Sequence, residues 1–481
     1  MKRYKRIYIL LGVLVVACAI TFGVSQYEEQ QELIRNSGEV FMEVPYDSVQ
    51  ALSWEYEEES LAFHRDETWL YDEDEAFPVD EEKMEELLSP FASFTAAFVI
   101  EEVEDYGQYG LDEPVCSIHL TTEEETYDIL LGDYSTMDSQ RYISIGDGNV
   151  YLVEDDPLDD FTLVLSDMID NDDIPVFEEV ERIQFTGTEN YEAVYQEDSD
   201  DTYREEDVYF AELDGDVLPL DTDKVESYLQ DIRFMDLGTY VSYNATDEEI
   251  AACGLDDPEL TITVDYTDED EDGNPVSGTF VLSISRDPEE LAAAEEAAVE
   301  ENSDSEDTAA EEEEEEITAY ARVGESQILY QLTSDDYKAL MAASQDDLRH
   351  SEVLPTDVED VTQLEISLDG EDYTITSLTD GEERSYYYQE ELTDIADIQS
   401  ALSALTADSF TQEAPSGKEE IALTLTLDRE GDPTVTIAFY RYDGTYCLAE
   451  IDGEPVSLVE RSLVVDLIEA VNALVLNETH Q

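Results

Sequence analysis

The chain has 481 residues, which is enough for roughly three domains of ordinary size. Its 21 Lys and Arg against 126 Asp and Glu give a formal net charge of −105, while 42% of the residues are hydrophobic. The apolar content predicts folded domains. The acidic surface excludes nucleic acid as a partner, because it repels phosphate backbones.

Residues 1–26 differ in kind from the rest of the chain. Four basic residues precede the apolar run Ile7–Val24, which is just long enough to cross a bilayer as a helix. Because basic flanks stay in the cytoplasm, we expect a single-pass protein of the cell membrane, with a cytoplasmic N-terminus and an extracytoplasmic ectodomain. The alternative is a lipoprotein processed at Cys18, but the apolar run continues past this cysteine, which favours an uncleaved anchor.

Beyond the anchor, the sequence repeats itself. The motif YGLDEP at Tyr109–Pro114 recurs as CGLDDP at Cys253–Pro258, and the helical pattern of Pro78–Leu88 recurs at Pro219–Leu229. A third, weaker copy of the pattern follows, without a GLD motif. Glycine, aspartate and proline at these positions predict a turn that leads into a strand, and a turn tolerates the loss of GLD in the third copy better than a reactive site would.

These matches divide the chain into segments. After the cytoplasmic flank and anchor, we expect repeat one at residues 27–172, repeat two at residues 173–348 and repeat three at residues 349–481. The spacing between matched motifs grows within repeat two, at residues 287–316. Because this tract is acidic, rich in alanine and without aromatic residues, we expect a disordered insertion there.

Each repeat shows the same predicted elements. Alternating apolar and polar residues with Gly-Asp and Asp-Gly turns predict antiparallel hairpins, joined by one principal helix and a short closing helix. The predicted fold class is therefore α+β: three tandem units of mainly antiparallel sheet after an N-terminal transmembrane helix. Three cysteines lie beyond the anchor, too few for a disulfide framework, so we expect buried thiols.

Reactive motifs are scarce. The chain has four histidines and neither HExxH nor CxxC, so a transition-metal site would have to be assembled from residues distant in sequence. Asp268, Asp270 and Asp272, followed by Gly273, reproduce the first half of a calcium loop. Thr279 stands where the bidentate glutamate belongs, which favours a solvated hairpin tip. Calcium is thus a weak candidate at these three aspartates, and we expect no other cofactor.

The order of features resembles a known family. A basic and apolar N-terminus, the strand residues Trp69 and Leu70, the Pro-x-Asp helix start and the YGLDEP motif resemble a bacterial family of membrane-anchored domains of unknown function. Its members occur beside ABC-transporter auxiliary and gliding-motility-type proteins. The resemblance implies a role in the envelope, with a transporter permease or other envelope proteins as partners, and supplies no catalytic residues.

Repetition without repeated reactive residues leads to a functional expectation. We expect a non-enzymatic extracytoplasmic accessory or scaffold protein of the cell envelope, attached to the membrane through its N-terminal helix. Two alternatives stay open. One is a cation-dependent surface adhesin or binding module, and the other is a surface hydrolase that uses two of the many carboxylates.

Overall fold

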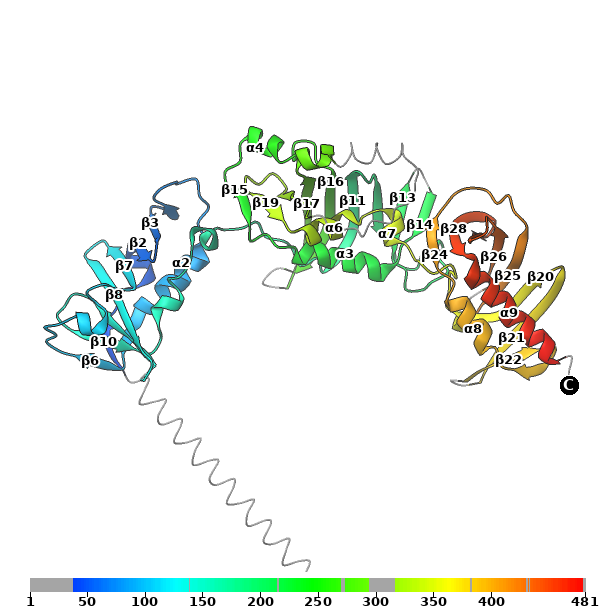
Figure 1. Ribbon diagram of the computed structural model, residues 1–481, viewed down its shortest axis with the longest axis horizontal. Helices are drawn as coiled ribbons and strands as arrows, with labels where there is room; N and C mark the ends of the chain where they lie inside the picture. Colours follow the sequence, from blue (N-terminus) through cyan, green and yellow to red (C-terminus); the bar gives the residue numbers. More distant parts are fainter. Residues whose placement is uncertain are drawn as a thin grey trace, which may run out of the picture. The chain divides into compact units, whose positions relative to one another are not determined.

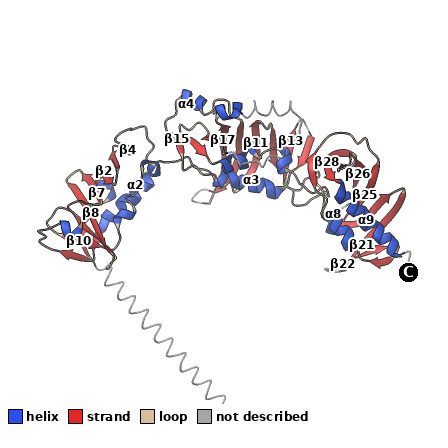
Figure 2. Ribbon diagram, viewed as in Figure 1, coloured by secondary structure: helices blue, strands red, loops and turns tan. Residues whose placement is uncertain are grey.

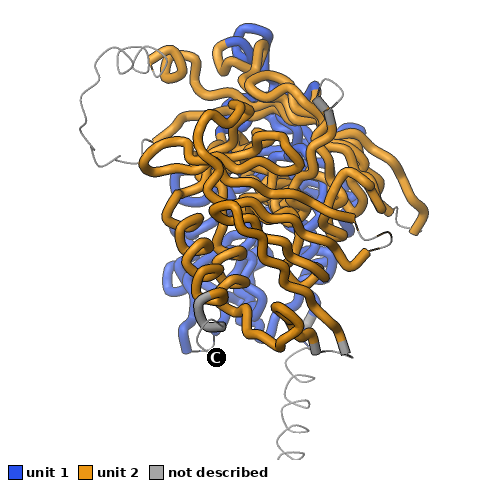
Figure 3. Tube along the Cα trace, turned by 90° about the vertical axis from the view of Figure 1, so that its right-hand side faces the viewer, with its two compact units in different colours: residues 1–173, 237–251, 325–331 blue, residues 174–236, 252–324, 332–481 orange. Residues whose placement is uncertain are grey.

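The structure is a computed structural model, which describes residues 38–137, 139–213, 216–269, 273–293, 316–380, 383–429, 431 and 433–478. The chain divides into two compact units (Figure 3). Compact unit 1 comprises residues 1–173, 237–251 and 325–331, and compact unit 2 comprises residues 174–236, 252–324 and 332–481.

The first large sheet is antiparallel and has eight strands, in the order β4-β3-β2-β7-β8-β9-β10-β6 (Figure 1). The bounds of these strands are β2 Val49–Tyr56, β3 Glu59–Arg65, β4 Trp69–Tyr71, β6 Phe98–Ile100, β7 Cys116–Thr122, β8 Thr126–Ser135, β9 Gln140–Ser144 and β10 Val150–Val153. A separate two-stranded sheet pairs β1 (Glu39–Met42) with β5 (Phe94–Ala96). Helix α2 (Glu81–Leu88) buries Met84, Leu87 and Leu88 on one side, as the helical spacing of its apolar residues predicts.

The second large sheet has nine strands, in the order β14-β13-β12-β11-β16-β17-β18-β19-β15. The bounds of its strands are β11 Glu179–Gly187, β12 Tyr191–Tyr195, β13 Tyr209–Leu213, β14 Asp216–Pro219, β15 Tyr240–Ser242, β16 Leu260–Glu269, β17 Pro275–Arg286, β18 Ala319–Val323 and β19 Leu329–Leu332. Helices α3 Thr222–Phe234, α4 Asp247–Ala252, α6 Ser334–Met341 and α7 Gln345–Leu348 also lie in this stretch of the chain.

The third large sheet also has nine strands, in the order β23-β22-β21-β20-β25-β26-β27-β28-β24. The bounds of its strands are β20 Val361–Leu368, β21 Glu371–Asp380, β22 Glu383–Tyr388, β23 Glu391–Thr393, β24 Ala407–Phe410, β25 Glu419–Leu427, β26 Thr434–Arg441, β27 Tyr446–Ile451 and β28 Glu454–Glu460. Helices α8 (Ala396–Ser403) and α9 (Arg461–Glu478) contact each other and contribute buried aliphatic side chains to the core of this sheet.

Short 3-10 helices also occur among the described residues. They are η1 Tyr46–Ser48, η2 Ser89–Ser93, η3 Gly107–Tyr109, η4 Pro157–Asp159, η5 Leu165–Met168 and η6 Val358–Asp360.

The three large sheets share one strand order. In each, a meander of three or four strands is followed along the chain by a helix, an edge strand and a second meander. The first strands of the two meanders pair with each other, as β2 with β7, β11 with β16 and β20 with β25. The strand that follows the helix, β6, β15 or β24, lies at the far edge of its sheet. Strict alternation of buried side chains along strands such as β25 explains why each sheet has one core face.

The predicted α+β fold class is wrong. The structure consists mainly of four antiparallel sheets, and its helices are a minor component beside them (Figure 2). Polar segments such as β22 and β23 form strands because pairing with neighbouring strands, rather than an apolar pattern, stabilises them. In the third repeat, a helix follows the last strand: α9 begins at Arg461, directly after β28.

The predicted transmembrane segment falls outside the described part of the chain. Within the described ranges, no helix is both long and apolar enough to cross a membrane. The proposed boundaries of the three repeats stay a prediction.

The tract expected to be an insertion is partly described. Residues 288–293 are helical, and the carboxylate of Glu290 accepts a hydrogen bond from the backbone N–H of Thr318 at 3.0 Å. The backbone N–H of Asp287 donates to the carbonyl oxygen of Thr318 at 2.8 Å. Residues 294–315 lie outside the described residues.

The two GLD motifs adopt the same turn. Gly110 and Gly254 have φ angles of +71° and +72°, a left-handed conformation that favours glycine. A Cβ added at either position would lie 2.6 Å from a side-chain oxygen. In the third sheet, Gly417 comes just before β25, and a Cβ there would lie 1.8 Å from the carbonyl oxygen of Arg441. Close backbone approach thus requires a glycine here although the GLD motif is missing.

Candidate functional site

Compact unit 2 contains a cavity of about 260 Å³ beside the start of α3 and the edge strand β24. Apolar side chains from several elements line one part of it. Its charged part is formed by Arg204, Asp207, Arg349, His350 and Glu352.

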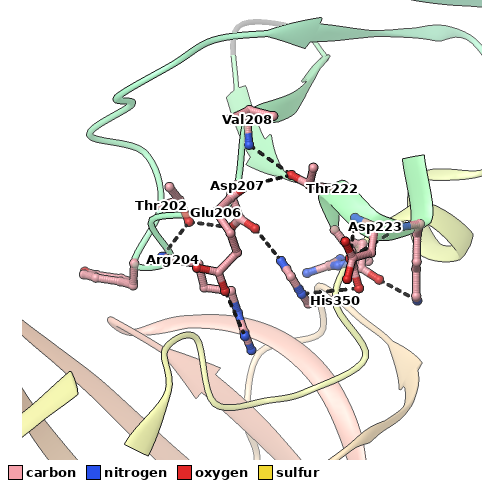
Figure 4. A network of polar contacts seen from close by, with 12 residues as sticks. Thr202, Arg204, Glu206, Asp207, Val208, Thr222, Asp223 and His350 are labelled. Carbon is pink, nitrogen blue, oxygen red and sulfur yellow. Dashed lines mark hydrogen bonds and ion pairs between the residues drawn. The ribbon is translucent and has the colours of Figure 1, made fainter. Parts of the chain in front are cut away.

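The centre of the charged part is a histidine bound to a buried carboxylate. His350 Nε2 lies 2.7 Å from Oδ1 of Asp207, and the Asp207 side chain is 1% exposed (Figure 4). The other oxygen of Asp207 accepts a hydrogen bond from the Thr202 hydroxyl at 2.6 Å. A buried carboxylate needs such donors, so His350 Nε2 is the donor in its contact with Asp207.

The start of α3 holds Asp207 in place. Thr222, the first residue of the helix, donates its hydroxyl proton to the carbonyl oxygen of Glu206 at 2.9 Å (Figure 4). The same hydroxyl accepts a hydrogen bond from the backbone N–H of Val208 at 3.1 Å. These two bonds fasten the loop on both sides of Asp207 to the helix.

The second ring nitrogen of His350 faces two more carboxylates. Nδ1 lies 3.5 Å from Oδ2 of Asp221 and 3.8 Å from Oε2 of Glu352. Asp221 caps α3, and its other oxygen accepts hydrogen bonds from the backbone N–H groups of Asp223 and Lys224. Asp221, His350 and Glu352, here called the His350 corner, each offer one ligand atom, and these atoms lie within 4.8 Å of one another.

Backbone hydrogen bonds fix the segment that carries His350. The N–H of Asp221 donates to the carbonyl oxygen of Leu348 at 2.9 Å. On its other side, the segment forms an isolated bridge between Glu352 and Thr406, beside β24. The imidazole is therefore held between the helix start and the third sheet by main-chain contacts.

Two further polar side chains line the cavity. The Arg349 guanidinium lies 3.9 Å from the centre of the Phe410 ring and 3.7 Å from Asp346, and burial lowers its pKa. Burial, followed by the hydrogen bond to Asp452, raises the pKa of Tyr203 to about 12. Arg349 remains charged and Tyr203 neutral near pH 7.

Ser457 gives the cavity an unusual polar atom. Its side chain is 1% exposed, and its hydroxyl oxygen has no hydrogen-bond partner among the described residues. A buried hydroxyl without a partner costs about 1–3 kcal/mol, so a polar ligand in the cavity would satisfy it.

Of the three predicted calcium residues, only Asp268 lies in the described part of the chain. Asp268 is the last residue but one of β16, and its Oδ1 accepts a hydrogen bond from the backbone N–H of Glu178 at 2.8 Å. Asp270 and Asp272 lie outside the described residues. The calcium hypothesis stays a prediction.

The other two histidines of the described chain, His64 and His119, lie in strands β3 and β7. His64 and His119 each contact one aspartate at 2.6 Å, Asp72 and Asp128 respectively, and all four side chains are well exposed. Each pair lacks a buried carboxylate comparable to Asp207. The His350 corner escaped sequence analysis because His350 and Asp207 are 143 residues apart. The only signals were the rarity of histidine and the recurring helical pattern of Pro219–Leu229, which contains Asp221.

Fold and site together define a protein of tandem antiparallel sheets with one histidine-carboxylate corner among its described residues. The chain belongs to the family DUF4340, a domain of unknown function, which matches residues 69–216 and 213–424. The family-level prediction of a domain of unknown function is thereby confirmed. No curated protein and no solved structure matches the chain.

Proposed function

We propose that the chain is a non-enzymatic accessory or scaffold protein of the bacterial cell envelope. The observation that carries the proposal is the shared strand order of the three large sheets. What recurs is the framework of strands and glycine turns, whereas the His350 corner occurs once in the described chain. Repeated sheets of this kind provide extended surfaces for binding other proteins.

The proposed location is the outer side of the cell membrane, with residues 1–26 as the attachment. The basic and apolar character of this segment supports the proposal. Protease added to intact protoplasts should then digest the sheets, and complete protection would refute the location. A lipid-modified N-terminus at Cys18 would change only the kind of attachment.

The proposed partner is the permease of an ABC-type transport system, as the family resemblance suggests. The full chain, tagged and purified from solubilised membranes of the cell that makes it, should recover the permease. A chain with residues 1–26 replaced by a cleavable secretion signal is the matched control, and it should recover less. The proposal fails if a functional transporter is repeatedly purified without the chain and transport is unchanged when its gene is deleted.

A second candidate function is a binding module for a small polar ligand. The cavity beside Arg349 favours it, and so does the hydroxyl of Ser457, which has no partner within the described ranges. Val456 lines the same cavity, so Val456→Trp should fill it. Native mass spectrometry of the chain purified from its own cell should show a bound small molecule that this variant lacks. An identical mass excess in both proteins, or none in either, would exclude the binding module.

A further inference from the structure

We propose that Asp221, His350 and Glu352 bind a divalent transition-metal ion, for which Zn²⁺ is the matching probe. The site goes beyond the proposed scaffold function and does not depend on it. His350 Nδ1, Asp221 Oδ2 and Glu352 Oε2 supply the ligand atoms.

The orientation of the imidazole prepares it as a ligand. Asp207 accepts the Nε2 proton of His350 at 2.7 Å, so the lone pair of the neutral ring lies on Nδ1. A histidine that ligates a metal ion almost always donates its other ring proton to a carboxylate or carbonyl group, which fixes the ring and raises its basicity. Asp207 is therefore a positioning residue of the site.

The distances around Nδ1 suit a metal ion better than hydrogen bonds. Separations of 3.5 Å to Asp221 and 3.8 Å to Glu352 are long for hydrogen bonds. Two ligand atoms bound tetrahedrally to Zn²⁺ at about 2.0–2.1 Å lie about 3.3 Å apart. The three atoms already lie within 4.8 Å of one another, and the Glu352 side chain is 47% exposed, so closure of this side chain would bring them toward that spacing.

The kind of donor atoms selects the class of ion. One imidazole nitrogen and two carboxylate oxygens suit Zn²⁺ and neighbouring transition metals, whereas Ca²⁺ and Mg²⁺ prefer sites built from oxygen alone. Asp207, Asp221 and Glu352 surround the imidazole with negative charge that a divalent cation would compensate. The neighbouring Lys224 ammonium has a different acceptor, since it donates to the carbonyl oxygen of Arg349 at 2.8 Å.

The first sheet supplies a matched control. There the N–H of Asp80, the cap of α2, donates to the carbonyl oxygen of Met168 at 2.9 Å, as Asp221 does to Leu348. Asp170 follows Met168 by two residues, as His350 follows Leu348. Asp172 then corresponds to Glu352. Asp80, Asp170 and Asp172, here called the Asp170 corner, thus repeat the backbone arrangement without an imidazole.

Calorimetric titration of the full chain with Zn²⁺, in a large excess of Mg²⁺, tests the proposal. The Mg²⁺ saturates oxygen-only sites on this acidic surface, so the imidazole-containing site should remain as one saturable equivalent. His350→Gln and Glu352→Gln should abolish it, whereas Asp170→Asn and His119→Asn should leave it unchanged. Asp207→Asn should weaken the affinity about 10-fold to 100-fold.

The variant Asp221→Asn separates loss of Zn²⁺ binding from loss of folding. Asparagine caps a helix as well as aspartate does, so this variant removes a ligand charge and keeps α3. Circular dichroism should match the wild type, while Zn²⁺ affinity falls at least 10-fold. The proposal is overturned if the wild type shows no saturable Zn²⁺ binding in excess Mg²⁺. It is equally overturned if the folded Asp221→Asn and Glu352→Gln variants bind Zn²⁺ like the wild type.

Discussion

The Asp170 corner and the His350 corner have the same backbone and different chemistry. In both, an aspartate caps the principal helix and donates its N–H to the segment that closes the sheet. At the Asp170 corner, desolvation and then the charge of Asp80 raise the pKa of Asp170. At the His350 corner, an imidazole occupies the corresponding position and contacts the buried carboxylate of Asp207.

The difference between the two corners distinguishes features that recur in the sheets from residues that only one sheet has. Caps, glycine turns and strand order recur because each sheet needs them to fold. His350 and Asp207 are not needed for that frame, since the first sheet forms the same corner with Asp170. A residue that departs from the repeat pattern and lies at a cavity is therefore the better functional candidate.

The largest predicted effect is at Asp207. Asp207→Ala leaves the ring proton of His350 without its buried acceptor, and we expect a local stability loss of about 3 kcal/mol. Hydrogen exchange should increase around residues 202–222. Both tryptophans, Trp54 and Trp69, lie in the first sheet, so the fluorescence transition on denaturation should not move. A shift of that transition would show that the effect is not confined to the His350 corner.

The two caps should be equivalent. Asp80→Ala and Asp221→Ala each remove a side-chain acceptor at a helix start, and each should cost about 1 kcal/mol, with asparagine restoring most of it. Tryptophan fluorescence measures the loss at Asp80, and hydrogen exchange of α3 measures it at Asp221. A loss at only one cap would contradict the shared frame.

Removing a charge from the Asp170 corner should raise the stability of the fold, whereas the cap substitutions lower it. The folded-state pKa of Asp170 is raised, so its ionised form destabilises the fold as pH rises through that pKa. Asp170→Asn should stabilise the first sheet near pH 7, by less than about 0.5 kcal/mol because the side chain is exposed and screened. Urea denaturation at pH 7 and pH 3 measures the difference, which should vanish at pH 3 and shrink in high salt. Destabilisation at pH 7 would mean that Asp170 has a favourable partner.

The smallest effect should come from the acidic tract of the second repeat. Deleting residues 294–315 should change hydrogen exchange of the flanking strands very little. Extending the deletion to residues 289–316 also removes Glu290, which accepts a hydrogen bond from Thr318, so exchange in β18 should rise. Equal effects of the two deletions would show that the Glu290 contact contributes nothing.

Local patterns predicted part of this structure. The caps at Asp80 and Asp221 and the turns at Gly110 and Gly254 follow from residues close in sequence, and the structure has them. Edge strands such as β23 were missed, because strand pairing decides them and their own composition does not.

The candidate site was beyond local analysis. His350 meets Asp207 and Asp221 only after the second sheet has formed and the segment after α7 has returned to the start of α3. In a chain with 126 acidic residues, no pattern marks which carboxylates will surround a histidine. The main-chain hydrogen bond from Asp221 to Leu348 brings His350 beside Asp221.

X-ray diffraction at the zinc absorption edge, from crystals of the full chain grown with Zn²⁺ and excess Mg²⁺, tests the central claim most directly. We predict one anomalous peak about 2.0–2.1 Å from Nδ1 of His350, in contact with Asp221 and Glu352, and none at the Asp170 corner. A His350 corner without a peak, with Nδ1 hydrogen-bonded to one of its carboxylates, would contradict the claim.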